Sequence, residues 1–289
     1  MTDPSPPRTV YVNGAWLPEG EAKISVFDRG FLFADGVYEV TSVLDGRLID
    51  LAQHMARLRR SLGELSMPAP ASDAELEAIH RELIARNRLT EGMVYLQVTR
   101  GAADRDFVYP ADPKPSLVLF TQARPLADTP AGRNGIRVLT LSDLRWRRRD
   151  IKTVQLLAPS MTKMAARAAG VDDAWMVEDG LITEGTSSNA YLVTGDGVVI
   201  TRPLSHAILS GITRAALFAY AAEAGTLIHE RPFTPEEARG AAEAFVTAAS
   251  AFVTPVVEID GVRLGDGRPG PVTRRLRELY LAEARRRAT

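Results

Sequence analysis

The sequence predicts an α+β protein built from two domains. Apolar alternation typical of strands occurs together with helical periodicity in both halves of the chain. Between the halves, residues 123–135 are rich in Pro, Gly and Asn and have no hydrophobic period. A chain of 289 residues is long enough for two cores. We therefore expect a small N-terminal α/β domain over residues 1–126, a linker over residues 127–135 and a larger C-terminal α/β domain over residues 136–289.

Two turn signals and one helix cap organise the first domain. Asn13-Gly14 and Asp45-Gly46 each stand between apolar-alternating segments, which predicts two hairpins. Ser72 followed by Glu75 forms a capping-box pattern, which predicts a helix that ends near Arg88. We also expect a helix over residues 53–65 and strands over residues 93–100 and 116–122.

The second domain is expected to alternate strands with helices. Gly170 and Gly225 each follow an amphipathic segment and are typical of helix ends. Residues 183–189 crowd hydroxyl side chains around one carboxylate, which predicts a loop between two strands. The expected strands cover residues 136–141, 174–178, 189–194, 244–249 and 255–259, and the expected helices cover residues 160–169, 212–224, 235–240 and 272 onward.

The composition excludes several classes of protein. With 36 acidic and 35 basic residues, the chain lacks the basic excess that proteins use against nucleic acids or anionic membranes. It has no cysteine, which excludes disulfides and thiolate chemistry. It shows neither an apolar run of membrane-spanning length nor a secretory leader, so we expect a cytoplasmic protein. Its four histidines are too far apart in the sequence to predict a metal site.

The basic residues are distributed unusually, because 31 are arginines and only four are lysines. One lysine, Lys152, follows a run of arginines in the segment RWRRRDIKTVQLL. Lysine adds little charge there, but its amine can form a Schiff base and a guanidinium cannot. The alternative is a lysine at a strand edge with a solvated head. This segment alone leaves both interpretations open.

Three further features are unremarkable when taken singly. The segment from Leu209 to Arg214 opens a predicted helix, where free N–H groups and the Thr213 hydroxyl would suit a phosphate, or where a plain cap would suffice. Glu184 is the one carboxylate of the hydroxyl-rich loop, and Arg57 lies in a predicted helix. An amine, a phosphate cradle, a carboxylate and an arginine are together the parts that a pyridoxal phosphate site requires.

Six segments together resemble the fold-type IV pyridoxal phosphate enzymes, and the D-amino acid aminotransferases are the most similar group among them. The resemblance extends from about Tyr11 to Tyr280. The segments are DRGFLFADGVYEV (28–40), YLQVTRG (95–101), RWRRRDIKTVQLL (145–157), TEGTSSN (183–189), ILSGITR (208–214) and FVTAASAFVTPVVEIDG (245–261).

The resemblance implies roles for individual residues. Lys152 would be the Schiff-base lysine and would move a proton between substrate and cofactor. Glu184 would face the pyridine nitrogen and hold the ring as a pyridinium. Arg57 would bind the phosphate of the cofactor. The remaining implied cofactor contacts are Leu209 against the ring and the helix start Gly211, Ile212 and Thr213 at the phosphate.

The chain departs from the family pattern in two places. Ala248 and Ala249 stand where the family has a pair of hydroxyl residues at the phosphate, which leaves only backbone contacts there. The substrate carboxylate is expected to meet Tyr38 and, from a partner subunit, an Arg-x-His pair. Arg105 matches the arginine, but Phe107 replaces the histidine and cannot donate a hydrogen bond. This replacement bears on the substrate range.

The resemblance implies a homodimeric transaminase with its active site at the subunit interface. A D-amino acid would pass its amino group through pyridoxal phosphate to a 2-oxo acid such as 2-oxoglutarate or pyruvate, in a ping-pong mechanism. The alternatives are an (R)-amine or branched-chain L-amino acid transaminase and a 4-amino-4-deoxychorismate lyase. A noncatalytic binding protein with a relic site is an alternative of another class.

Overall fold

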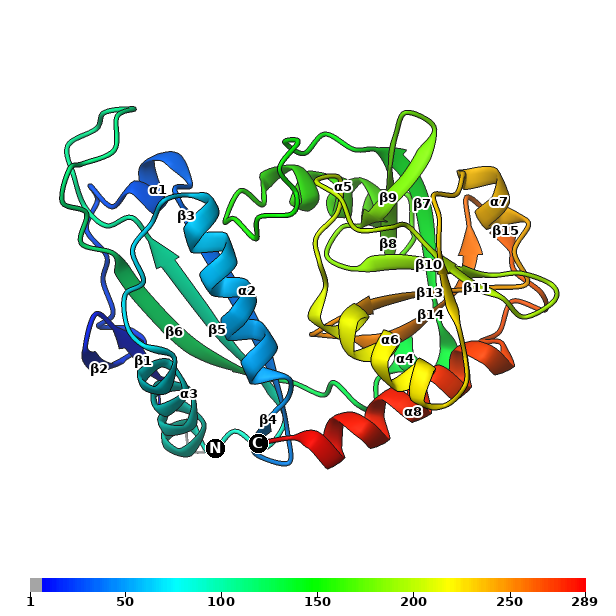
Figure 1. Ribbon diagram of the computed structural model, residues 1–289, viewed down its shortest axis with the longest axis horizontal. Coiled ribbons are helices and arrows are strands. Elements are labelled where there is room, and N and C mark those ends of the chain that lie inside the picture. The colour runs from blue at the N-terminus through cyan, green and yellow to red at the C-terminus, as the bar shows by residue number, and fades with distance from the viewer. Residues whose placement is uncertain (1–6) are drawn as a thin grey trace, which may run out of the picture. The chain divides into compact units, whose positions relative to one another are not determined.

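A computed structural model describes residues 7–289, which form two compact units (Figure 1). The first unit contains the chain up to Arg124 together with Ile151–Gln155 and Ala288–Thr289. The second unit contains Pro125–Asp150 and Leu156–Arg287. Residues 1–6 of the predicted first domain lie outside the described residues. No helix in the described part of the chain is long and apolar enough to cross a membrane.

The first unit is built on a six-stranded antiparallel sheet with the strand order β2-β1-β6-β5-β3-β4. Both predicted hairpins form, because Asn13-Gly14 and Asp45-Gly46 adopt the positive φ angles that tight turns need. The capping box of Ser72 and Glu75 also forms. The elements are β1 (Thr9–Val12), β2 (Ala15–Pro18), α1 (Arg29–Phe33), β3 (Gly36–Leu44), β4 (Arg47–Leu48), α2 (Leu51–Glu64), α3 (Asp73–Asn87), β5 (Gly92–Thr99) and β6 (Ser116–Ala123).

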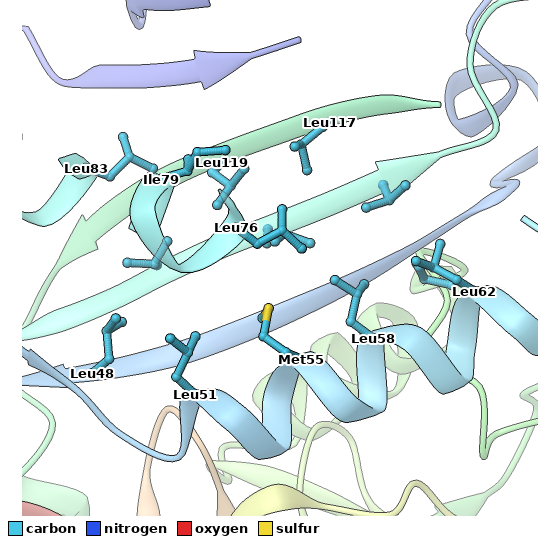
Figure 2. Packing of buried hydrophobic residues seen from close by; sticks show 14 of the residues in the cluster. Leu48, Leu51, Met55, Leu58, Leu62, Leu76, Ile79, Leu83, Leu117 and Leu119 are labelled. Carbon is cyan, nitrogen blue, oxygen red and sulfur yellow. The ribbon is translucent and has the colours of Figure 1, made fainter. Parts of the chain in front are cut away.

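The core of the first unit lies between this sheet and helices α2 and α3. In Figure 2, Leu51, Met55, Leu58 and Leu62 point from one stripe of α2 toward the strands. Their spacing of three and four residues places them on one helix face. Leu76, Ile79 and Leu83 of α3 and the inward side chains of the strands complete the same cluster.

The other face of this sheet carries a row of aromatic side chains. Tyr38 on β3 stacks on Tyr95 of β5, with 5.5 Å between ring centroids, and Tyr95 stacks on Phe120 of β6 at 4.7 Å. All three rings are half-buried. Because side chains alternate along a strand, Tyr38 lies on this face while its neighbour Glu39 lies on the face that α2 covers.

The second unit contains a mixed nine-stranded sheet. Its strand order is β12-β11-β10-β13-β14-β7-β8-β9, and β15 pairs with β14. The elements are α4 (Pro130–Asn134), β7 (Ile136–Ser142), α5 (Leu157–Ala168), β8 (Asp173–Glu178), β9 (Leu181–Gly185), β10 (Asn189–Val193), β11 (Val199–Thr201), α6 (Ile212–Glu223), β12 (Ile228–Glu230), α7 (Pro235–Arg239), β13 (Glu243–Ala248), β14 (Phe252–Ile259), β15 (Val262–Arg263) and α8 (Pro271–Arg287).

Most elements agree with the sequence predictions, and three differences matter. The predicted linker contains the short helix α4, which begins with a Thr129 cap and Pro130. Glu184 lies in strand β9, where the sequence predicted a loop, because β9 pairs with β8 across an Asp179-Gly180 turn. The short strands β11 and β12 at one end of the sheet were not predicted, since three residues are too few to show a period.

Candidate active site

Lys152 belongs to a short segment that pairs with β3 in the first unit. The Tyr38 N–H donates to the Lys152 carbonyl at 3.0 Å, and Val37 forms an isolated bridge with Thr153. The Lys152 side chain is directed to the ring of Tyr38, with Nζ 4.1 Å from the ring centroid. The structure therefore brings together the predicted amine and the predicted substrate tyrosine.

Arg57 is held by a carboxylate that the sequence did not single out. Its Nε donates to Glu39 Oε1 at 2.8 Å and its Nη2 donates to Oε2 at 2.7 Å, which is a bidentate pair. His54 Nδ1 donates to the same Oε2 at 2.7 Å. Burial by itself would raise the pKa of Glu39, but Arg57 and His54 outweigh it and hold that pKa at about 2. Glu39 is therefore an ionised carboxylate in a buried setting.

One stripe of α2 connects Arg57 with the Lys152 segment. His54, Arg57 and Ser61 follow one another at spacings of three and four residues, so they lie along one face of the helix. The Ser61 hydroxyl accepts a hydrogen bond from the Lys152 N–H at 3.4 Å. Arg57, Tyr38 and Lys152 thus belong to one neighbourhood of the first unit.

Arg105 and Phe107 lie apart from that neighbourhood on the exposed loop after β5. The Arg105 guanidinium lies 5.3 Å from the ring of Phe33 and 5.7 Å from the ring of Phe107. The Phe107 side chain is 79% exposed. Among the described residues of the first unit, Arg105 makes no contact with Lys152 or Tyr38.

Glu184 is a buried acid of the second unit and has three partners. Arg145 Nη1 donates to its Oε1, Asn189 Nδ2 donates to Oε2 at 3.0 Å, and the Leu209 N–H donates to both oxygens at 3.2 Å. Burial raises the pKa of Glu184, and the positive charge of Arg145 acts against that rise. The carboxylate is thereby fixed in position, and its charge depends on Arg145.

Arg145 is itself part of a chain of buried charges. Its Nη2 donates to Asp143 at 2.7 Å, and the Asp143 side chain is fully buried. Burial would raise the pKa of Asp143, but Arg145 and the Thr183 hydroxyl lower it. Arg149 lies 3.4 Å from Asp143 and forms a bidentate pair with Glu178. This network holds Arg145 against Glu184.

The N-terminus of α6 lies close to Glu184 in the second unit. Its N-cap, Gly211, provides no side-chain hydrogen bond, so the first-turn N–H groups of Ile212 and Thr213 keep their donor capacity. A Cβ at Gly211 would collide with Asn189 Oδ1, and Asn189 also donates to the Leu209 carbonyl at 3.0 Å. Asn189 therefore connects the acid to the helix start.

The predicted alanine pair lies at the end of β13 in the second unit. Ala248 is the last residue of the strand and Ala249 begins the turn that follows, and both are half-buried. The hydroxyl of Thr247, just before them, donates to Tyr191 inside the unit. In the described part of the chain, no group of three or more His, Asp and Glu side chains could hold a metal ion.

Sequence reasoning missed four residues of the site. Glu39 and His54 support Arg57, and Arg145 and Asn189 support Glu184. The spacing of His54 and Arg57 on a predicted helix was a usable signal, since residues three apart share a face. Glu39 gave a second signal, because an acid on the helix-covered side of an apolar strand needs a partner.

Comparisons with known proteins decide the family. The model of the amino-transferase class IV family matches residues 36–259, which is more than half of the chain. The chain belongs to this family. A D-alanine aminotransferase of Bacillus licheniformis is 39% identical over 265 residues, which are 92% of this chain and 93% of that protein.

Solved structures of branched-chain aminotransferases share the fold. The branched-chain amino acid aminotransferase of Escherichia coli has a TM-score of 0.90 and 25% identity, and the match covers 96% of this chain and 95% of that one. The branched-chain aminotransferase of the archaeon Thermoproteus uzoniensis, solved with norvaline, has a TM-score of 0.86 and 28% identity, with 95% and 93% covered. The predicted α+β class and the resemblance to fold-type IV aminotransferases are confirmed.

Proposed function

We propose that this class IV aminotransferase is a pyridoxal phosphate-dependent transaminase that moves an amino group from a D-amino acid to a 2-oxo acid. The observation that carries the proposal is the similarity to D-alanine aminotransferases over more than nine-tenths of the chain. The side chains that such a reaction needs are all present. An amine, a buried arginine, a buried carboxylate and a helix start without a side-chain cap form the donor set.

This donor set fits pyridoxal phosphate group by group. The Lys152 amine suits an aldehyde, the Glu184 carboxylate suits a protonated ring nitrogen, and Arg57 with the N-terminus of α6 suits a phosphate. When bound, the cofactor withdraws electrons from the Cα of an amino substrate. Lys152 would accept and return the Cα proton, since a free amine within reach of the substrate can act as acid and base.

Supporting residues make these roles physically reasonable. Arg145 opposes the rise in the pKa of Glu184 that burial causes, and so favours the charged form that a pyridinium requires. Asn189 donates to both Glu184 and the Leu209 carbonyl, so one side chain positions the two residues that would hold the ring of the cofactor. Ala248 and Ala249 would offer backbone contacts alone to the phosphate.

We propose that Arg105 and Tyr38 bind the substrate carboxylate. Arg105 forms no ion pair within the described chain, so its fork is available to a carboxylate. Phe107 adds no donor and makes that side of the pocket apolar. An arginine that anchors the carboxylate relative to a fixed Lys152 would also set which face of Cα is deprotonated, and thereby the preference for one enantiomer.

The test is a single-turnover experiment on purified holoenzyme. We expect D-alanine or D-glutamate to remove the visible absorbance band of the bound cofactor, and the L enantiomers to leave it. Lys152→Ala should lack the band altogether, while Arg147→Ala, a change at an exposed arginine of the same segment, should keep it. A preference for L-amino acids would overturn the proposal in favour of a branched-chain transaminase.

A second candidate, an (R)-amine transaminase, is favoured by one observation. Phe107 removes a hydrogen-bond donor from the loop that would bind the substrate carboxylate. An amine substrate has no carboxylate, so the replacement of the histidine would weaken its binding less than it would weaken the binding of an amino acid. (R)-1-phenylethylamine distinguishes the two candidates, because only the second predicts that it reacts as fast as D-alanine.

We propose that the protein is a homodimer in which Arg105 and Phe107 serve the partner's site. Exposed apolar side chains support this assembly. They are Phe31, Phe107 and Val108 in the first unit and Leu157, Met161 and Met164 along α5 in the second. Light scattering should give twice the chain mass of 31.5 kDa. The cytoplasmic location stays a prediction, which cell fractionation would test.

Subunit mixing tests the shared site. Arg105→Ala and Lys152→Ala should each be inactive. In an equal mixture after subunit exchange, about half of the dimers are heterodimers, and each heterodimer has one intact site of its two. The mixture should therefore regain about one quarter of the wild-type activity. If both residues served the same subunit, no activity would return.

A further inference from the structure

In the first unit, the loop that carries Arg105 is tied to the start of α1 at both of its ends (Figure 1). Asp28 accepts a hydrogen bond from the Thr99 hydroxyl at the end of β5, at 2.9 Å, and from the Ser116 hydroxyl at the start of β6, at 2.7 Å. Asp28 is buried, so water competes little for these bonds. The loop over residues 100–115 therefore leaves and re-enters the sheet at fixed points.

Two buried arginines and one carboxylate support this loop. Arg100 donates to both oxygens of Asp35, through Nε at 2.8 Å and through Nη2 at 3.1 Å. Arg29 Nε donates to Asp35 Oδ2 at 2.8 Å, and its Nη1 donates to the Asp106 carbonyl in the loop. The side chains of Arg29 and Arg100 are 3% and 1% exposed. Asp35 thereby fixes both guanidinium groups, and Arg29 connects them to the residue that follows Arg105.

Aromatic rings lie between these buried arginines and Arg105. The Arg100 guanidinium lies 3.5 Å from the centroid of the Tyr109 ring, and Arg29 lies 5.5 Å from the same centroid. Arg29 also lies 4.5 Å from the centroid of the Phe33 ring, and Arg105 lies 5.3 Å from it. A cation over an aromatic face is attracted by the quadrupole of the ring. The two buried arginines are thereby connected to Arg105 through aromatic contacts.

The Arg105 side chain depends on aromatic rings for its position. In residues 7–289, no ion pair or hydrogen bond holds its guanidinium, which lies over the rings of Phe33 and Phe107. Phe107 is exposed on the same loop, whereas Phe33 belongs to α1 and also contacts the buried Arg29. Phe33 therefore connects Arg105 to the fixed part of the unit. A guanidinium that stacks through its face keeps the N–H groups at its edge for a carboxylate.

We propose that Phe33 is a positioning residue that holds the Arg105 guanidinium for the substrate carboxylate. The proposal rests on the proposed function, which assigns the carboxylate to Arg105. Because Phe107 offers no donor, the orientation of this one guanidinium decides how well the ionic contact forms. An arginine that is already ordered loses less conformational entropy when the substrate binds. Phe33 thus strengthens substrate binding through Arg105.

A merely structural role for Phe33 makes a different prediction. If Phe33 only packs α1 against the loop, its loss would lower the stability of the unit or would impair every substrate alike. If Phe33 acts through Arg105, its loss impairs only substrates that carry a carboxylate. D-Alanine and D-alaninamide form a matched pair for this comparison, because they differ only in that group.

Single-turnover kinetics on the holoenzyme provide the test. The loss of cofactor absorbance gives a maximal rate and a half-saturating concentration for each substrate. Phe33→Leu keeps an apolar side chain but removes the aromatic face, and Phe33→Tyr keeps that face. Phe31→Leu is the matched control, because Phe31 also lies on α1 and is 75% exposed. If Phe33→Leu does not fold, Phe33→Met takes its place as a flexible apolar side chain without a ring.

We expect Phe33→Leu to raise the half-saturating concentration of D-alanine about three- to tenfold, which is the effect of losing one cation–π contact. Its maximal rate should not change, because the lost interaction contributes equally to the bound substrate and to the transition state. D-Alaninamide should be unaffected, and Phe33→Tyr and Phe31→Leu should behave as the wild type does. An unchanged value for D-alanine, or equal losses for D-alanine and D-alaninamide, would overturn the inference.

The inference and the proposed function fail in different ways. If the wild type reacts with D-alanine and Phe33→Leu leaves its half-saturating concentration unchanged, the inference is wrong and the proposed function stands. If the wild type prefers L-alanine, or reacts with neither enantiomer, the proposed function fails and the inference fails with it.

Discussion

Replacing Arg145 with glutamine should destabilise the second unit in a manner that depends on pH. The Arg145 side chain is 12% exposed and is paired with two buried acids, Asp143 and Glu184. Removing one partner of a buried ion pair costs about 3–5 kcal/mol, because it leaves an uncompensated charge. We expect a loss in this range at pH 8 for the Arg145→Gln protein without cofactor.

The sign of the pH dependence follows from the two acids. Burial already raises the pKa of Glu184, and without Arg145 the pKa rises further, so the folded variant binds a proton that the unfolded chain has released. Its free energy of unfolding therefore falls as the pH rises. Asp143 has a lowered pKa in the wild type, so it contributes stability above its unfolded value of about 4 that is lost as the pH falls. Both effects increase the difference in unfolding free energy between wild type and Arg145→Gln at high pH.

Urea unfolding at pH 5 and pH 8 measures this gap. The difference in unfolding free energy between wild type and Arg145→Gln should be larger at pH 8, by about 1.4 kcal/mol for each unit by which the pKa of Glu184 rises. Arg147→Gln is the matched control, because Arg147 is exposed in the same segment, and its effect should stay within about 0.5 kcal/mol. An equal loss at both pH values would refute the electrostatic role of Arg145.

Three further substitutions test the site. Gly211→Ala should lower cofactor affinity about tenfold, because its Cβ displaces Asn189, while Gly195→Ala, which meets open space, should leave spectral titrations unchanged. Phe107→His should raise kcat/KM for D-amino acids by about 10- to 100-fold through one new hydrogen bond to a charged group, without helping an amine that lacks a carboxylate. Lys152→Arg should keep the circular dichroism spectrum of the wild type and abolish transamination, and retained activity would exclude Lys152 as the reacting amine.

Local signals in the sequence predicted most of the fold. The hairpins at Asn13-Gly14 and Asp45-Gly46 and the cap at Ser72 depend on residues within a few positions of one another, and all three form. Strand β9 was missed although the Asp179-Gly180 turn before it is the same kind of signal. The hydroxyl-rich residues after Glu184 predicted a loop for the whole segment. They do form a loop, but it begins only after the strand that contains Glu184.

Only the residues expected to touch the cofactor could be predicted from the sequence, and the residues that support them could not. Lys152 and Glu184 belong to segments whose pattern resembles a known family. The role of Arg57 was predicted from the same resemblance. The residues that hold these side chains come from elsewhere in the chain. Glu39 reaches Arg57 because β3 packs under α2, and Asn189 reaches Glu184 because β10 begins beside the loop before α6. Such pairings depend on the assembled sheets, and no local period encodes them.

The scarcity of lysine also acquires a physical reason from the structure. Arg57, Arg100 and Arg149 are buried, and each grips one carboxylate with two parallel N–H donors, a geometry that an ammonium cannot provide. Lys152 has the opposite surroundings. In residues 7–289 no carboxylate forms an ion pair with its Nζ, which lies against the ring of Tyr38. An amine in that position offers a nucleophile to a carbonyl, whereas a guanidinium would supply charge without a nucleophile.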